Sequence, residues 1–411
     1  MPTINAERLI ADLRQLAKFG KVETGVCRVA MSREDIEARH WLLERMTEAG
    51  LDAEIDRVGN VLGRSRRSGP ALLIGSHSDS QPRGGWLDGS LGVIYGLEIA
   101  RALSECDETA DCAVDVVSFQ DEEGTLYGCL GSRVFSGKLT AEDIDAASSR
   151  DGRPLRDVIA AAGLSDRPLL QLDSDRHAAY LEAHIEQGRI LEDAGEKIGV
   201  VTRIVGIRQH RIRFVGEANH AGTTQMHIRK DAGVALIDFA YRTRQAFSEI
   251  AGPSTVWTIG QIELDPGAAS IIPGASEMTL QYRDPQIERL DRLEKAIQEM
   301  VESVQSDGVV EVSTTQRTPI SPSLMDEGLQ GHIAVAAEQH SPGAWRRMPS
   351  AAGHDPMILV DRLPCAMLFV PSIGGISHDF AEDTHEEDIA LGCQVLATAA
   401  AAICGSLDTK L

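Results

Sequence analysis

Positive charge is scarce in this chain. Its 40 Lys and Arg residues are outnumbered by 62 Asp and Glu residues, which leaves a formal net charge of −22. A field of this sign repels nucleic acid and anionic membrane surfaces, so we expect neither as a partner. It also repels anionic small molecules, so a substrate that carries a carboxylate needs a local cationic anchor on the protein.

Paired cysteines and long apolar segments are also missing. The seven cysteines are scattered along the chain and form no Cys-x-x-Cys pair, which is typical of reduced thiols in a cytoplasm. We find no apolar run of transmembrane length. The first residues predict an amphipathic helix with Asn5 as its N-cap, not a signal peptide. These features predict a soluble, cytoplasmic protein.

The composition is otherwise that of a globular protein, with 43% hydrophobic and 25% charged residues. A chain of 411 residues exceeds what one hydrophobic core usually supports, so we expect two domains. Between residues 39 and 124, apolar strands alternate with helical segments and polar turns, as in "ALLIGSHSD" and "CAVDVVSFQDEEG". This rhythm predicts an α/β domain with a mainly parallel sheet covered by helices.

A different pattern begins near residue 203. Residues 203–222 alternate apolar and polar side chains, which is typical of a half-exposed strand. A helix, two strands, a second helix and a last strand follow, and Ala-rich, buried α/β character returns after Ser321. We therefore predict a catalytic domain split into residues 1–202 and 320–411, with an α+β domain of residues 203–319 inserted between them.

Four polar segments interrupt the apolar stretches of the predicted catalytic domain. They read "SHSDSQPRGGWLDG", "QDEEG", "LEAHIEQGR" and "GGISHDFAED", and each follows a predicted strand or opens a helix. The carboxyl ends of parallel strands meet at one edge of a sheet, where chemistry gathers. Several His and carboxylate side chains suit a pair of divalent metal ions such as Zn, Mn or Co. A carboxylate can bridge two ions about 3.5–4 Å apart.

Taken singly, each segment also has an ordinary structural explanation. His77 and Asp79 can form a hydrogen-bonded pair in a loop, the acidic turn at residues 121–123 can be solvated, and Ser377 can cap a helix. The occurrence of four such segments, all next to glycine and at strand ends, favours a metal site. Adjacent Glu122 and Glu123 can then differ in role, one as a ligand and the other as a base.

Seven stretches of the chain follow one another in an order and at a spacing that are specific to one family. They read "GSHSDSQPRGGWLDGSLGV", "FQDEEG", "GSRVFSG", "LEAHIEQGRILE", "NHAGTTQMHIRKDA", "AGHDPM" and "GGISHDFAED". With them the chain resembles the hydantoinase/carbamoylase family of di-metal amidohydrolases, from about residue 5 to the C-terminal helix. That family includes N-carbamoyl-L-amino acid hydrolase, allantoate amidohydrolase and β-ureidopropionase.

The resemblance implies a role for each site residue. Asp88 is expected to bridge two divalent ions, Glu122 to be the general base, and Asp79 to orient the ring of His77. The full set of implied metal ligands is His77, Asp88, Glu123, His184 and His378. The inserted domain is expected to mediate homodimerisation.

The implied reaction is hydrolysis of a linear amide or ureido C–N bond. The favoured substrate is an N-carbamoyl-L-amino acid, which gives the amino acid, carbon dioxide and ammonia. Allantoate or another N-acyl or ureido acid is the alternative substrate. The alternative of another class is a dimeric metal-binding module without catalysis, which the intact Glu122 disfavours.

The resemblance also implies contacts with a small-molecule substrate. The residues concerned are Gln187, His220, Ser270, Arg283 and the backbone at Gly353. His220 is expected to reach the partner's site and stabilise an oxyanion. Arg283 is expected to bind the substrate carboxylate, although a surface salt bridge with Asp284 or Glu288 is the alternative.

Two positions depart from the family pattern. Ser270 stands where Asn is usual, and it cannot offer both an amide donor and a carbonyl acceptor. Gln225 stands where Pro is usual, in the loop that carries His220. The usual carboxylate contact is therefore in doubt, and a different or bulkier substrate becomes possible. His354 and Asp355 are either a pair that supports the ligands or ordinary loop residues.

Overall fold

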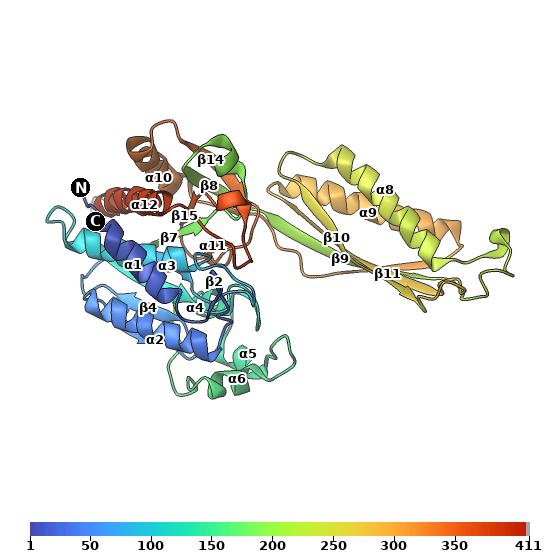
Figure 1. Ribbon diagram of the computed structural model, residues 1–411, viewed down its shortest axis with the longest axis horizontal. Coiled ribbons are helices and arrows are strands. Elements are labelled where there is room, and N and C mark those ends of the chain that lie inside the picture. The colour runs from blue at the N-terminus through green and yellow to red at the C-terminus, as the bar shows by residue number, and fades with distance from the viewer. Residues whose placement is uncertain (408–411) are drawn as a thin grey trace. The chain divides into compact units, whose positions relative to one another are not determined.

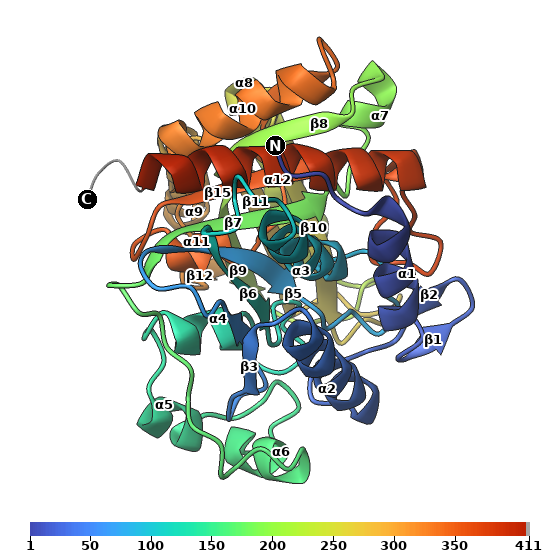
Figure 2. The same ribbon diagram turned by 90° about the vertical axis from the view of Figure 1, so that its left-hand side faces the viewer.

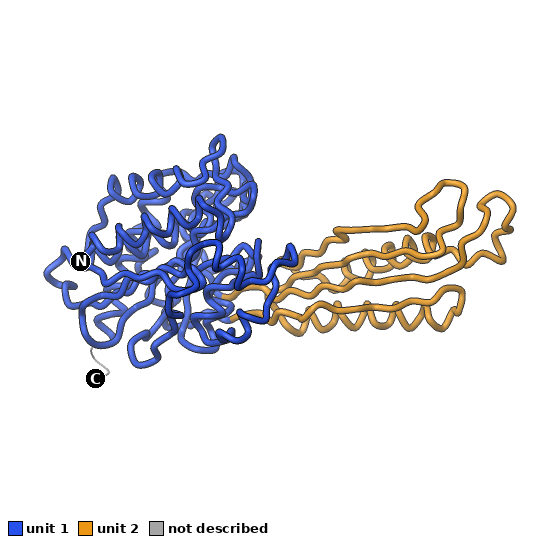
Figure 3. The backbone as a smooth tube through the Cα atoms, turned by 90° about the horizontal axis from the view of Figure 1, so that it is seen from below, with its two compact units in different colours: residues 1–202, 324–411 blue, residues 203–323 orange. Residues whose placement is uncertain are grey.

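The computed structural model describes residues 1–407 and divides the chain into two compact units (Figure 3). Residues 1–202 and the chain from residue 324 onward form unit 1, and residues 203–323 form unit 2. The chain leaves unit 1 after Thr202 and returns to it at Leu324, so unit 2 is an insertion within unit 1.

Unit 1 is built on a mixed sheet (Figures 1 and 2) whose strand order is β13-β8-β15-β7-β5-β6-β4-β3, with β14 paired to β8. Its four central strands run parallel: β15 (Cys365–Val370), β7 (His177–Ile185), β5 (Ala71–His77) and β6 (Ala113–Phe119). The outer strands are β3 (Asp52–Ile55), β4 (Val61–Arg64), β8 (Ile198–Ile204), β13 (Ser323–Leu324) and β14 (Trp345–Ser350). The predicted α/β fold with a mainly parallel sheet is thereby confirmed.

Helices surround this sheet. They are α1 (Ala6–Leu16), α2 (Arg33–Glu48), α3 (Ser90–Ser104), α4 (Leu130–Phe135), α5 (Ala141–Ala146), α6 (Leu155–Ala161), α7 (Ile190–Ala194), α10 (Glu327–His340), α11 (Pro356–Leu359) and α12 (Glu386–Leu407). A short hairpin of β1 (Lys21–Val22) and β2 (Gly25–Val26) and a 3₁₀ turn η2 (Ile373–Gly375) complete the unit.

The central strands are buried along nearly their whole length, and Ala178 of β7 is their one half-buried residue. Ile74 and Val116 belong to the core that contains the apolar side chains of α3 and α12. Phe119 instead packs edge-on against Phe135 of α4, with ring centroids 5.5 Å apart. Because successive strand residues point to opposite faces, these contacts show that helices cover both faces of the sheet.

Helix α12 corrects one prediction. Within residues 1–407 it is the single helix that is long and apolar enough to cross a membrane by length and composition, whereas the sequence analysis found no such run. Of its apolar stretch, 61% is buried inside unit 1, where Cys393 and Leu396 join the main core. A helix that packs against other elements on most sides is apolar nearly all round, which explains the composition.

Unit 2 is an antiparallel sheet with two long helices. Its strand order is β10-β11-β9-β12, with bounds Val256–Asp265, Ala275–Asp284, Gly206–Val215 and Glu311–Gln316. The helices are α8 (Ala232–Ile250) and α9 (Ile287–Asp307), with a 3₁₀ turn η1 at Met226–Ile228. Alternate residues of β11, among them Met278 and Leu280, join the core formed with both helices. The intervening residues of β11 lie on the opposite face of the sheet, which explains the alternation in the sequence.

Candidate metal centre

The carboxyl ends of the four central strands carry the polar segments. His77 is the last residue of β5, and β6 ends four residues before Glu123. His184 is the penultimate residue of β7, and β15 leads through η2 to His378. Asp88 lies just before α3. The sheet therefore brings together five residues that are far apart in the sequence.

Asp88 lies at the centre of this arrangement. Its Oδ1 is 3.0 Å from Nε2 of His184 and 3.6 Å from Nε2 of His77. Its Oδ2 is 3.4 Å from Nε2 of His378, which is itself 3.5 Å from Oε2 of Glu123. Within residues 1–407 there are thus two groups that could hold a metal ion, His77–Asp88–His184 and Asp88–Glu123–His378, and they share Asp88.

The buried imidazoles are oriented by backbone groups. Nδ1 of His184 is 2.9 Å from the carbonyl of Ile185, so it carries the proton. Nε2 of the same ring accepts the N–H of Gly89 at 3.1 Å, which shows that this nitrogen presents a lone pair to the centre. Nδ1 of His77 is 3.0 Å from the carbonyl of Asp79. Both rings therefore offer Nε2 as a ligand atom.

Buried charge of one sign accumulates around Asp88. Burial raises the pKa of Glu122 well above its usual value, and Asp355, Glu123 and Asp88 raise it further. Burial and the charge of Asp88 raise the pKa of Glu123 to about 7. Such a cluster of carboxylates is unfavourable unless cations compensate it.

The donor set fits divalent first-row metals. Three imidazole nitrogens and two carboxylates converge, one carboxylate is shared, and the surrounding negative charge calls for positive ions. Glu122 lies beside this set, with Oε2 3.6 Å from Nε2 of His77, and its side chain is almost fully buried. It is therefore placed to act on a molecule bound at the centre.

The position of Asp79 differs from the simple picture of a carboxylate bound to an imidazole. Its backbone carbonyl is the near neighbour of the His77 ring, whereas its carboxylate oxygen Oδ1 is 3.7 Å from Nδ1. Within residues 1–407 neither carboxylate oxygen of Asp79 has a hydrogen-bond partner, and the nearest cation is Arg39 at 3.9 Å. Burial and the charge of Asp121 raise the pKa of Asp79.

Several residues of the centre were not singled out in the sequence. Gln81 donates to both carboxylate oxygens of Glu123, at 3.1 and 2.8 Å. Arg28 is fully buried and donates to the carbonyl of Ser78 at 2.6 Å and to Oγ of Ser90 at 2.8 Å, so it joins the two loops that carry His77 and Asp88. The one signal for Arg28 in the sequence is a charge inside the apolar stretch "GVCRVA".

Two of the predicted substrate-binding residues lie in unit 1. Nε2 of Gln187 donates to Oδ2 of Asp88 at 2.9 Å and to Oγ of Ser377 at 3.0 Å. Gly353 lies in the loop between β14 and α11, next to His354. The ring of His354 is 4.5 Å from that of His184, and its Nε2 is 3.0 Å from Oγ of Ser350.

The other three lie in unit 2. Nδ1 of His220 accepts the N–H groups of Gly222 and Thr223, which leaves Nε2 to carry the proton of the neutral ring. The carbonyl of Ser270 accepts the N–H of Ala221 at 2.9 Å, so Ser270 lies beside the His220 loop. Arg283 donates to Oε1 of Gln281.

A parallel sheet with imidazoles and carboxylates at its carboxyl end is typical of metal-dependent hydrolases. Residues 73–402 match the family described as Peptidase family M20/M25/M40, and the chain belongs to that family. Enzymes of this family are metal-dependent.

Relatives narrow the chemistry. The chain is 35% identical to an N-carbamoyl-L-amino acid amidohydrolase of Geobacillus stearothermophilus, over 96% of this chain and 97% of that one. It is 33% identical to a ureidoglycolate hydrolase of Oryza sativa, over 97% and 84%, and 30% identical to the allantoate amidohydrolase of Escherichia coli, over 93% and 94%.

Solved structures agree. A crystal structure of an amidase of the hydantoinase/carbamoylase family from Burkholderia phymatum matches with a TM-score of 0.93 and 50% identity, covering 99% of each chain. The predicted membership of this family is confirmed. The protein is therefore a hydrolase of this family, and its relatives support amidohydrolase activity.

Proposed function

We propose that this amidohydrolase cleaves an N-carbamoyl-L-amino acid to the amino acid, carbon dioxide and ammonia. The observation that carries the proposal is the sharing of Asp88 by two ligand groups with Glu122 beside them. The two groups would hold two divalent ions, Zn, Mn or Co. When bound, such ions polarise a carbonyl and make a water molecule more acidic.

Glu122 performs the proton transfers in this proposal. Its carboxylate accepts a proton from the water molecule that attacks the ureido carbon, and returns it to the nitrogen that leaves. Its Oε2 lies 3.6 Å from Nε2 of His77, within reach of a molecule bound at the centre. Glu123 does not share this role, because its carboxylate faces His378 and the amide of Gln81.

Unit 2 supplies the anchor for the substrate carboxylate. Arg283 lies on the face of β11 opposite to Tyr282, whose side chain belongs to the core with the helices. Its guanidinium and the amide of Gln281 offer planar donors to a carboxylate. His220 offers Nε2–H to the oxyanion that forms during attack. Gln187 and the backbone at Gly353 complete the predicted contacts.

Ser270 favours a range of substrates that extends beyond N-carbamoyl-L-amino acids. It is exposed, and its carbonyl is engaged by Ala221, so only its short hydroxyl is left for a ligand. Allantoate or another ureido or N-acyl acid is therefore the second candidate. The names of the relatives, which include an allantoate amidohydrolase and ureidoglycolate hydrolases, support this range.

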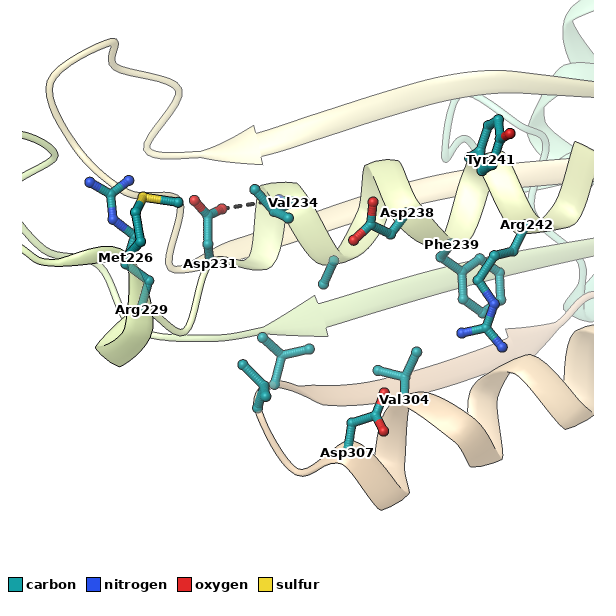
Figure 4. Close-up of a pocket in the computed structure, with 13 residues that line it drawn as sticks. Met226, Arg229, Asp231, Val234, Asp238, Phe239, Tyr241, Arg242, Val304 and Asp307 are labelled. Atoms are coloured by element: carbon teal, nitrogen blue, oxygen red, sulfur yellow. Dashed lines mark hydrogen bonds between the residues drawn. The ribbon is translucent and has the colours of Figure 1, made fainter.

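We also propose a homodimer formed through unit 2. The edge strand β10 exposes Val256 and Ile262, and α8 exposes Val234, Ile237 and Tyr241 at helical spacing on one side. Val234 and Tyr241 also line a hollow of about 490 Å³, to which Val304 and Asp307 of α9 contribute (Figure 4). An apolar stripe beside an unpaired strand edge suits a second copy of the same surface.

Within residues 1–407 the seven cysteines form no disulfide, which supports a reducing compartment, and we infer that the protein is cytoplasmic. The remaining alternative is a dimeric metal-binding module without catalysis. Such a module would need the metal ligands, but it would not need a base at the position of Glu122.

One experiment separates these functions. The protein is stripped of metal, reloaded with Zn²⁺, Mn²⁺ or Co²⁺, and assayed with N-carbamoyl amino acids, allantoate, ureidoglycolate and N-acetyl amino acids. Release of ammonia and amine is measured for each. We expect metal-dependent turnover, highest with an N-carbamoyl-L-amino acid. No turnover with any substrate or metal, despite metal binding, would leave the binding module as the function.

A further inference from the structure

Glu382 is a buried carboxylate that none of the steps above uses. It lies in the loop after His378, and only 1% of its surface is exposed. A carboxylate removed from water in this way requires hydrogen-bond partners. The structure gives it three.

These partners join two separate loops. Oε1 of Glu382 accepts the backbone N–H of Asp88 at 3.0 Å and that of Leu87 at 3.3 Å. Oε2 accepts the hydroxyl of Ser377 at 2.9 Å, one residue before His378. One side chain therefore spans from the segment that carries Asp88 to the segment that carries His378.

The space for this side chain is kept open by Gly85. A Cβ atom at that position would lie 1.8 Å from Oε1 of Glu382 and 2.5 Å from its Cβ. The next residue of the same segment, Trp86, donates its indole N–H to Asp383 at 3.2 Å. Several hydrogen bonds thus join the segment before Asp88 to the loop after His378, and Glu382 makes the one to Asp88 itself.

The two ligand groups depend on this contact to different degrees. His77 and His184 lie on β5 and β7, where the sheet fixes them. His378 lies on a loop, its side chain is 52% exposed, and its φ of 53° is in the left-handed region that non-glycine residues rarely adopt. Its position therefore rests on the contacts of its own loop.

We propose that Glu382 is a positioning residue that sets the separation of Asp88 and His378, and so builds the Asp88–Glu123–His378 site. The inference rests on the proposed function, in which that group binds one of two metal ions. Glu382 acts through its reach and its acceptor oxygens, not through its charge.

Two substitutions distinguish the effect of the length of the Glu382 side chain from the effect of its charge. Glu382→Gln keeps the length and one oxygen for the N–H groups of Asp88 and Leu87, and its amide can donate to Ser377. Glu382→Asp keeps the charge but is one methylene shorter, so it cannot reach both loops. Asp379→Asn is the matched control, because it removes a partly exposed carboxylate from the same loop and keeps the oxygen that accepts the N–H of Ala381.

The measurement is calorimetric titration of metal-stripped full-length protein with Mn²⁺, with the free ion counted by electron paramagnetic resonance. We expect two ions per chain for the wild type, Glu382→Gln and Asp379→Asn. Glu382→Asp should keep one ion near wild-type affinity and bind the other about 10- to 100-fold more weakly, the usual loss when a group that supports a ligand is removed. Circular dichroism confirms that each variant is folded.

Each other outcome is informative. If Glu382→Asp binds both ions like the wild type, the inference is wrong while the proposed function stands. If Glu382→Gln loses the ion and Glu382→Asp keeps it, charge and not reach is what matters, and the inference is again wrong. If the wild type itself binds no Mn²⁺, the proposed metal centre fails and the inference falls with it.

Discussion

Both units of the chain combine a β-sheet with helices, but the two sheets differ in how far they are buried. In unit 1, every residue of β5 and β6 is buried, because helices cover both faces of a parallel sheet. In unit 2, β11 alternates between buried and half-buried residues, and β10 is exposed along most of its length. The central strands of unit 1 are therefore buried on both faces, whereas the sheet of unit 2 leaves much of its surface open to solvent.

The proposed function assigns different tasks to these two sheets. Imidazoles and carboxylates that meet in the interior of unit 1 interact strongly, because little water screens them. Their pKa values shift accordingly, as those of Glu122 and Glu123 do. The half-open sheet of unit 2 cannot hold such a cluster, but it can present Arg283 and Gln281 to a soluble ligand. We therefore expect unit 1 to carry out catalysis, and unit 2 to contribute to substrate selection and to dimerisation.

The strongest test of this division is Glu122→Gln. The amide keeps the shape of the side chain but cannot accept a proton, so we expect kcat to fall by about 10²- to 10⁴-fold, with metal content unchanged. Steady-state kinetics and metal analysis of the same samples give both quantities. Glu123→Gln is the contrast, because it should lose metal as well as turnover. Near-wild-type kcat in Glu122→Gln would refute its role as the base.

The buried unit could be predicted well from the sequence. Apolar strands that end in "SHSD" and "QDEEG" identify the parallel sheet and the edge at which its polar residues gather. The rule that carboxyl ends of parallel strands share one edge then brings His77 and Glu123 together. The family resemblance supplied Asp88 as the shared residue, and the structure places it between the two groups.

The supporting contacts could not be predicted, because they depend on distances between loops. Nothing in the local sequence indicates that Arg28 joins the carbonyl of Ser78 to the hydroxyl of Ser90. The same holds for Asp79, whose carbonyl and not its carboxylate lies nearest to the ring of His77. The Ala-rich end of the chain was predicted to be buried, as α12 is, but its apolar length was missed. An apolar helix of that length has the same composition in a core and in a membrane.

Removal of metal should affect only one unit. Without ions, the carboxylates around Asp88 repel one another, and the free energy contributed by binding is lost, about 2.7 kcal/mol when the free ion is at 100 times its Kd. The two units have separate cores, so unit 2 should not respond. Hydrogen exchange measured with and without a chelator should show lost protection at the loops of His77, Glu123 and His378, and none in residues 203–323. Equal loss in both units would contradict the separation.

The smallest effect is expected at the surface of unit 2. Ile237→Lys places a charge on the apolar stripe of α8, and in a two-fold symmetric dimer the same charge faces it or lies near it on the partner. A central apolar contact is worth about 1–2 kcal/mol, so the dimer dissociation constant should rise about 5- to 30-fold, while the melting temperature of the monomer stays the same. Val335→Lys is the matched control, because Val335 is 71% exposed on α10 of unit 1, against 61% for Ile237, and lies outside the proposed interface. Sedimentation equilibrium compares the association of the wild type and the two variants.

If both variants weaken association equally, the interface is not specific to unit 2. If neither does, the exposed stripe serves another purpose, and assembly does not distinguish the two units.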